Sequence, residues 1–94
     1  MKLSDKYILR KVAGERLLVQ RNSDSGSDRI IYMNETAADM LEQFIASNTA
    51  VQAAENLLSS YDVEIEQLIQ DAEEALRYFV QAGILIEDRA EEER

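Results

Sequence analysis

Residues 29–45 read RIIYMNETAADMLEQFI, and this stretch decides the fold because a strand pattern changes there into a helix pattern. Its first five residues are rich in β-branched and aromatic side chains, which favour a strand. Asn34 or Thr36 can cap a helix, and Glu35 lies where the helix dipole favours a negative charge. Apolar residues then recur on one helix face, at Ala37, Met40, Leu41, Phe44 and Ile45. The stretch therefore predicts a strand that leads directly into an amphipathic helix.

The residues before this stretch predict a β-hairpin and a loop. Residues 7–12 and 16–20 have the composition of strands, and Ala13-Gly14 between them is typical of a tight turn. Residues 21–28 contain no apolar side chain, which indicates a loop. The strand at residues 29–33 is then the third strand of a small antiparallel sheet.

The residues after this stretch predict two more helices. Ser47-Asn48-Thr49 ends the first helix and caps a second one, whose apolar face is Val51, Ala54, Leu57 and Leu58. Asp62 is the expected cap of a longer third helix, and Gly83 is expected just after its last turn. The core face of the third helix is predicted to comprise Ile65, Leu68, Ile69, Ala72, Leu76 and Phe79. Residues 84–86 are expected to pack back as a short extended segment.

This order predicts an α+β fold in which a three-stranded antiparallel β-sheet is followed by a three-helix bundle (βββααα). Three antiparallel strands need a second layer to bury one apolar face, and three amphipathic helices can supply it. The arrangement is winged-helix-like, with the sheet placed first. The 94 residues fit one small domain, which we expect to span residues 1–87 and to be followed by a charged, disordered tail at 88–94.

The composition excludes several classes of site. The chain has no histidine and no cysteine, so zinc sites, disulfides and catalysis by an imidazole or a thiolate are ruled out. Carboxylates on the third helix, such as Glu66 and Glu73, are expected to form a solvated face rather than a cation site. We therefore expect no catalytic residue, no metal and no cofactor. A signal peptide and a long apolar run are both missing, which predicts a cytoplasmic protein without a membrane partner.

The charges divide between the two halves of the chain. Residues 1–34 carry seven basic and four acidic side chains, whereas residues 35–94 carry three basic and fifteen acidic ones. A winged-helix regulator would present its helical half to DNA phosphates, and this excess of carboxylates disfavours that function. We therefore expect no nucleic-acid partner. The charge division could instead orient a charged partner, or the two halves could neutralise each other in the fold.

Residues 29–33 also predict a binding edge. The segment has one charge, Arg29, and no proline or glycine to block pairing with another strand. Ala75, Tyr78 and Ala82 form a second apolar stripe on the third helix, which could be one wall of a groove beside that strand. Two alternatives stay open: a helix or residues 84–86 could cover the edge, and the stripe could cover a strand of the same chain.

Three segments occur together in this chain: the opening hairpin at residues 8–15, the passage YMNETAADML at 32–41 and the closing helix that ends in Ala82-Gly83-Ile84-Leu85. In these segments the chain resembles the PqqD family, whose members are recognition elements for ribosomally made precursor peptides. The resemblance implies a non-catalytic domain that holds the leader of a precursor peptide and presents it to a maturation enzyme, often a radical S-adenosylmethionine protein. A leader would then add as a fourth strand along residues 29–33.

The resemblance and the edge together give the candidate peptide-binding residues. They are Arg29, Ile30, Ile31, Tyr32, Met33, Asp71, Ala75, Arg77, Tyr78 and Ala82. Arg29 and Arg77 are each expected either to pair with an acidic leader residue or to be paired within the domain. Two other functions remain as alternatives, a winged-helix transcriptional regulator and a small structural subunit that forms a homodimer through its edge strand.

Overall fold

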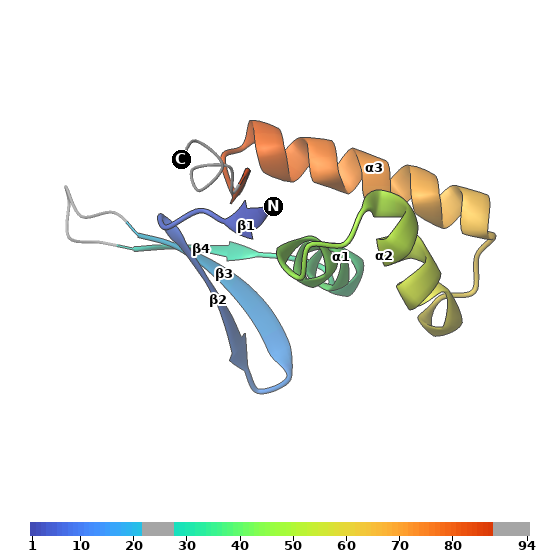
Figure 1. Ribbon diagram of the computed structural model, residues 1–94. Coiled ribbons are helices and arrows are strands. Elements are labelled where there is room, and N and C mark those ends of the chain that lie inside the picture. The colour runs from blue at the N-terminus through green and yellow to red at the C-terminus, as the bar shows by residue number, and fades with distance from the viewer. Residues whose placement is uncertain (22–27, 88–94) are drawn as a thin grey trace.

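A computed structural model describes residues 1–21 and 28–87 of the chain. The expected loop at 21–28 lies mostly outside these residues, and the expected tail at 88–94 lies wholly outside them. The order of the main elements is three strands and then three helices, which confirms the βββααα prediction (Figure 1). Within the described part, no helix combines the length and apolar character needed to cross a bilayer.

The hairpin consists of β2 (Tyr7–Val12) and β3 (Glu15–Gln20), which pair in an antiparallel register. Ala13 and Gly14 connect them with φ angles of 53° and 83°. Positive φ at both central residues characterises the type I′ turn, whose twist matches that of the flanking strands. The predicted turn is thus confirmed, although an alanine occupies one of its two left-handed positions.

Among the described residues, strand β4 (Arg29–Tyr32) pairs with β3 only, so the sheet has the order β2-β3-β4. Ile31 lies opposite Leu18, and both face the helices: Leu18 is fully buried and Ile31 packs against the core. Because side chains alternate along a strand, Ile30 and Tyr32 point to the other face, where both are exposed. The alternation therefore gives β4 one face toward the core and one toward solvent.

Helix α1 (Glu35–Ile45) begins immediately after β4, as predicted. The Asn34 side chain caps it by accepting a hydrogen bond from the Ala37 amide at 2.8 Å. Helix α2 (Ala50–Leu57) starts with a capping box, in which Thr49 and Gln52 each accept from the backbone amide of the other. A single 3₁₀ turn, η1 (Leu58–Ser60), follows α2 and leads toward α3 (Ile65–Gln81).

Two details of the helix predictions are wrong. Val51 and Leu58 are 44% and 36% exposed, and Ala53 instead joins the predicted Ala54 and Leu57 on the buried face of α2. Small side chains allow α2 to approach its neighbours closely, so the buried face is centred on the alanines and Leu57. Helix α3 is not capped by Asp62: its N-cap is Glu64, whose side chain makes no capping hydrogen bond.

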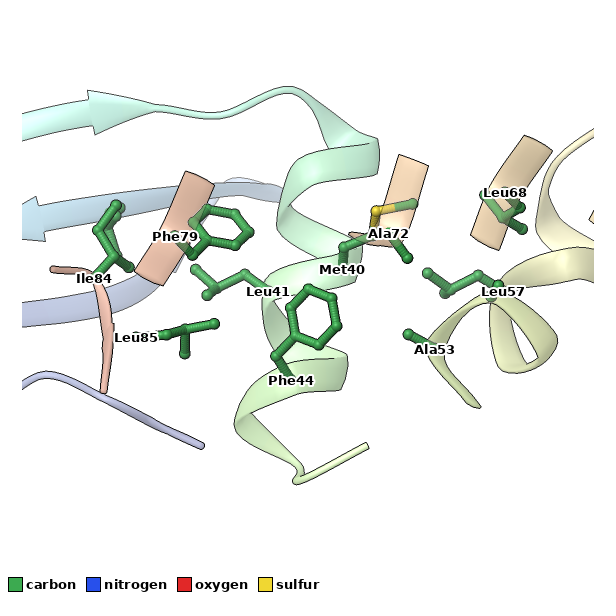
Figure 2. Packing of buried hydrophobic residues seen from close by; sticks show 12 residues of the cluster. Met40, Leu41, Phe44, Ala53, Leu57, Leu68, Ala72, Phe79, Ile84 and Leu85 are labelled. Atoms are coloured by element: carbon green, nitrogen blue, oxygen red, sulfur yellow. The ribbon is translucent and has the colours of Figure 1, made fainter. Parts of the chain in front are cut away.

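The core lies between the sheet and the helices and joins all three helices (Figure 2). Met40, Leu41 and Phe44 of α1 lie at its centre, in contact with residues of α2 and α3. The predicted core face of α3 is confirmed, since Leu68, Ala72 and Phe79 are buried and Ile65, Ile69 and Leu76 pack against the cluster.

A small second sheet joins the two ends of the described chain. Strand β1 (Lys2–Leu3) pairs with β5 (Leu85–Ile86), and the Ser4 amide donates to the Ile84 carbonyl at 2.9 Å. Gly83, at φ 77°, ends α3 through hydrogen bonds from the amides of Gly83 and Ile84 to the carbonyls of Val80 and Phe79. The predicted end of α3 at Gly83 is thus confirmed, and this turn directs residues 84–86 to β1 rather than to β4.

Candidate functional site

A groove runs between β4 and α3. Its volume is about 510 Å³. Its lining includes residues of β3, β4, α1 and α3, and comprises Leu18, Ile31, Tyr32, Met33, Asn34, Thr36, Ala37, Met40, Asp71, Glu74, Ala75, Tyr78, Phe79 and Ile84. Buried side chains such as Met40 and Phe79 form the floor, so the groove opens directly onto the apolar core.

The groove borders the open edge of the sheet. β4 pairs with β3 on one side, and no strand of the described residues pairs with its other side. The segment after α3, which was one candidate to cover this edge, pairs with β1. Backbone N–H and C=O groups of β4 are therefore available to an added strand, and the groove lies where such a strand would place alternate side chains.

Six of the ten candidate residues line this groove: Ile31, Tyr32, Met33, Asp71, Ala75 and Tyr78. Tyr78 is 58% exposed and stacks edge-on against Phe79, with ring centroids 5.6 Å apart. Its ring is thus supported on one side and exposed on the other, as a contact surface for an apolar side chain would be.

The other four candidate residues lie outside the groove lining. Arg29 is exposed at the start of β4, and Ile30 belongs to the solvent face of the sheet. Ala82 is the exposed C-cap of α3. Arg77 lines a different hollow, with Met1, Leu76 and Val80. The sequence offered Arg77 as a partner for an acidic leader residue, yet consecutive helical residues point about 100° apart, and Arg77 does not share the groove face of Tyr78.

Sequence reasoning missed the contributions of α1 and one acidic residue. Thr36, Ala37 and Met40 reach the groove because only two residues separate α1 from β4. Glu74 also lines it, one helical turn before Tyr78. The i, i+4 spacing of Glu74 and Tyr78 places them on one face of α3, and this signal in the sequence could have identified Glu74.

An ionic network holds α1 against the sheet beside the groove. Arg16 of β3 contacts Asp39 (Nη1–Oδ1, 2.6 Å) and Glu42 (Nη1–Oε1, 3.2 Å) of α1. The Tyr61 hydroxyl donates a hydrogen bond to the other Asp39 oxygen, which connects the segment after η1 to the same network. Since α1 supplies part of the groove, this network helps to fix the groove's shape.

The environment of the network shifts two pKa values. Burial raises the pKa of Tyr61 above its ordinary value, and the hydrogen bond to Asp39 raises it further because ionised tyrosine could not donate it. Burial alone would lower the pKa of Arg16, but hydrogen bonds and attraction from Asp39 and Glu42 outweigh this effect, and the pKa is raised. Arg16 is therefore held as a cation and Tyr61 as a neutral donor.

The groove's chemistry suits binding of a chain rather than of an ion. Within residues 1–21 and 28–87, no group of three or more acidic side chains could hold a metal. The groove combines apolar side chains, an exposed aromatic ring and a strand edge, which together can hold an extended peptide.

Comparison with known families assigns the chain. Residues 22–85 match the model of the family described as coenzyme PQQ synthesis protein D (PqqD). The chain belongs to the PqqD family. The match covers β4 and all three helices, and so includes every residue of the groove lining except Leu18. No curated protein matches the sequence of this family member.

Two solved structures share its fold. One is described as lasso peptide synthetase B1 complexed with the leader peptide; it is 19% identical, with a TM-score of 0.73, and the match covers 92% of this chain and 96% of that one. The other is TbiB1 in complex with the TbiA(β) leader peptide, at 15% identity and a TM-score of 0.67, covering 90% and 94% of the two chains. At such identities the likeness establishes the fold of this PqqD-family chain.

Proposed function

We propose that this chain is a non-catalytic domain that captures the leader of a ribosomally synthesised precursor peptide and presents it to a maturation enzyme. The observation that carries the proposal is the open edge of β4 alongside an apolar groove. Both structural neighbours are described as complexes with leader peptides, and this supports the same type of ligand here.

The leader adds to β4 as a fourth strand. All pairs in the sheet are antiparallel, and an antiparallel addition continues this pattern with the better hydrogen-bond geometry. Alternate leader side chains then enter the groove, where Ile31 and Ala75 offer apolar contacts and Tyr78 offers its exposed ring. Backbone hydrogen bonds supply affinity, and these contacts supply selectivity.

A binding role without catalysis agrees with the residues of the groove. The chain contains no histidine or cysteine, and the groove's only acidic side chains among the described residues, Asp71 and Glu74, lie on one helix. Hydrolysis by paired carboxylates needs two acids on opposite sides of the substrate, an arrangement that two residues one turn apart on α3 do not provide. The groove residues thus support the proposal that the chain presents a substrate for another protein to modify.

A scan of N-methylated peptides tests strand addition without altering the protein. The probe is a synthetic leader of a candidate precursor, a short peptide whose gene would lie beside that of this chain, N-methylated at one backbone position at a time. A methyl group removes one N–H donor, and only alternate residues of an edge-paired strand donate to their neighbour. We expect binding losses at every second position, measured by isothermal titration calorimetry, and amide shifts at residues 29–33.

The control is the same peptide with a scrambled sequence, which should bind much more weakly. Losses that show no alternation would reject strand addition, and the absence of any binding would reject the leader as the ligand. Sedimentation of the chain at micromolar concentration, with and without the leader, separates the homodimer alternative, which predicts a dimer through β4 that persists when the leader is added. A peptide-independent dimer through β4 would contradict the proposal.

A further inference from the structure

The groove has a charged side that the proposed function does not explain. Asp71 and Glu74 line it from α3, and no lysine or arginine joins them among the described lining residues. Asp71 is half-buried, and one of its oxygens accepts a hydrogen bond from Gln67 Nε2 at 2.9 Å, which orients the carboxylate. Glu74 is exposed and lies three residues, almost one turn, further along the helix.

We propose that the leader bound in this groove carries a lysine or arginine that pairs with Asp71 and Glu74. This inference rests on the proposed function, and it specifies which leaders the groove accepts. The sequence alone named Asp71 as a candidate without a partner, and it left Arg77 either to pair with an acidic leader residue or to be paired within the domain. Arg77, however, lines the hollow on another face of α3, whereas the two carboxylates face the space that the leader would occupy.

The direction of the elements places the basic residue within the leader. β4 and α3 run in opposite directions (Figure 1), so a strand antiparallel to β4 runs in the same direction as α3. Glu74 and Asp71 precede Tyr78 by four and seven residues, which corresponds to roughly 6 and 10 Å along a helix. A strand covers these distances in about two to three residues.

The basic residue is thus expected two or three positions before the leader residue that packs against Tyr78. A lysine or arginine two positions before points into the groove on the same side as that residue, because strand side chains alternate. Its long side chain can lay its methylene groups along Ala75 while its charged end reaches the carboxylates. The apolar floor and the acidic side therefore contact two residues of one leader strand that lie two or three positions apart.

Selection from a displayed library of random peptides tests this inference whichever precursor supplies the natural leader. The immobilised protein is the full chain, and selected peptides are kept only if Tyr78→Ala weakens their binding. We expect lysine or arginine to be enriched two or three positions before an apolar residue. In one such peptide, lysine-to-alanine replacement should weaken binding about three- to tenfold at low salt, and much less in about 1 M salt.

A matched pair of double variants separates the groove's charge from the charge of the whole chain. Asp71→Asn with Glu74→Gln removes the two groove carboxylates, whereas Glu66→Gln with Glu73→Gln removes two exposed carboxylates of α3 that do not line the groove. Both variants change the net charge equally. We expect the lysine preference to disappear in the first variant and to persist in the second, with unchanged circular dichroism in both.

Each outcome decides between the two proposals. Peptides that depend on Tyr78 but show no basic preference would overturn this inference and leave strand addition standing. A basic preference that both double variants lose equally would assign it to net charge, which also overturns the inference. If no selected peptide depends on Tyr78, the groove is not the binding site, and both proposals fail.

Discussion

Replacing Tyr78 by alanine removes the exposed aromatic side chain that α3 contributes to the groove and measures what this side chain contributes to peptide affinity. The side chain of Tyr78 is 58% exposed in the free protein. Aromatic side chains bury about 150–250 Å² when fully covered, so a bound peptide can cover about 100 Å² of this ring. At about 25 cal/mol per Å², this burial corresponds to an upper limit of about 2.5 kcal/mol.

The expected loss in the variant is smaller than this limit. Alanine keeps part of the contact surface, and the peptide loses conformational freedom when it is ordered against the ring. We expect a loss of about 1–2 kcal/mol, equivalent to about 5- to 30-fold weaker binding of the synthetic leader. Isothermal titration calorimetry of wild type and variant at the same salt concentration measures the ratio directly.

Folding should change little in the same variant. In the free chain Tyr78 makes an edge contact with Phe79 and is otherwise largely in solvent, so its removal should lower the free energy of unfolding by no more than about 1 kcal/mol. Val80→Ala is the matched control, because Val80 is 43% exposed on α3 but lines a different hollow. Unchanged affinity in Tyr78→Ala, or an equal loss in Val80→Ala, would refute the groove as the binding site.

Three further substitutions test the fold around the site, each by urea denaturation. Ala13→Asn should raise the free energy of unfolding by about 0.5–1 kcal/mol, because asparagine tolerates the left-handed φ of 53° better than alanine does. A decrease would contradict the type I′ turn. Gly83→Ala should lower the free energy of unfolding by about 1 kcal/mol through backbone strain alone, since a Cβ there meets no atom within 4 Å. An unchanged value would show that α3 ends differently. Tyr61→Phe should lower the free energy of unfolding by about 1 kcal/mol near neutral pH. Because the pKa of Tyr61 is raised in the folded state, its neutral hydroxyl stabilises the fold below about pH 10, and this stabilisation is lost as the pH rises beyond that value. The variant should therefore lose less stability than wild type under alkaline conditions. Parallel pH profiles of the two proteins would contradict the assignment.

Local sequence signals predicted the elements that form the site. The strand-to-helix passage at residues 29–45 contains its own cap, Asn34, and its own apolar periodicity, so neighbouring residues suffice to specify it. Gly83 likewise specifies the end of α3 because few other residues adopt its φ. The open edge of β4 followed from the absence of blocking residues in the strand itself.

Features that depend on distant contacts were not predictable in this way. A two-residue strand such as β1 has no periodicity, and its partner β5 lies more than eighty positions away. The phase of α2 depends on how closely Ala53 and Ala54 can approach other helices, which hydrophobicity alone does not rank. Glu74 lines the groove and Arg77 does not because of the rotation of α3 about its own axis. Packing of α3 against the core determines that rotation.

The pairing of β1 with β5 has a consequence for the groove at a distance. Ile84 belongs to the groove lining, and its carbonyl is held by the Ser4 amide at the start of the chain. The first few residues thus hold the floor of the groove in place, although none of them would touch a ligand there. Deleting them should loosen the groove at Ile84 and weaken binding of a leader, although every side chain that contacts the leader remains.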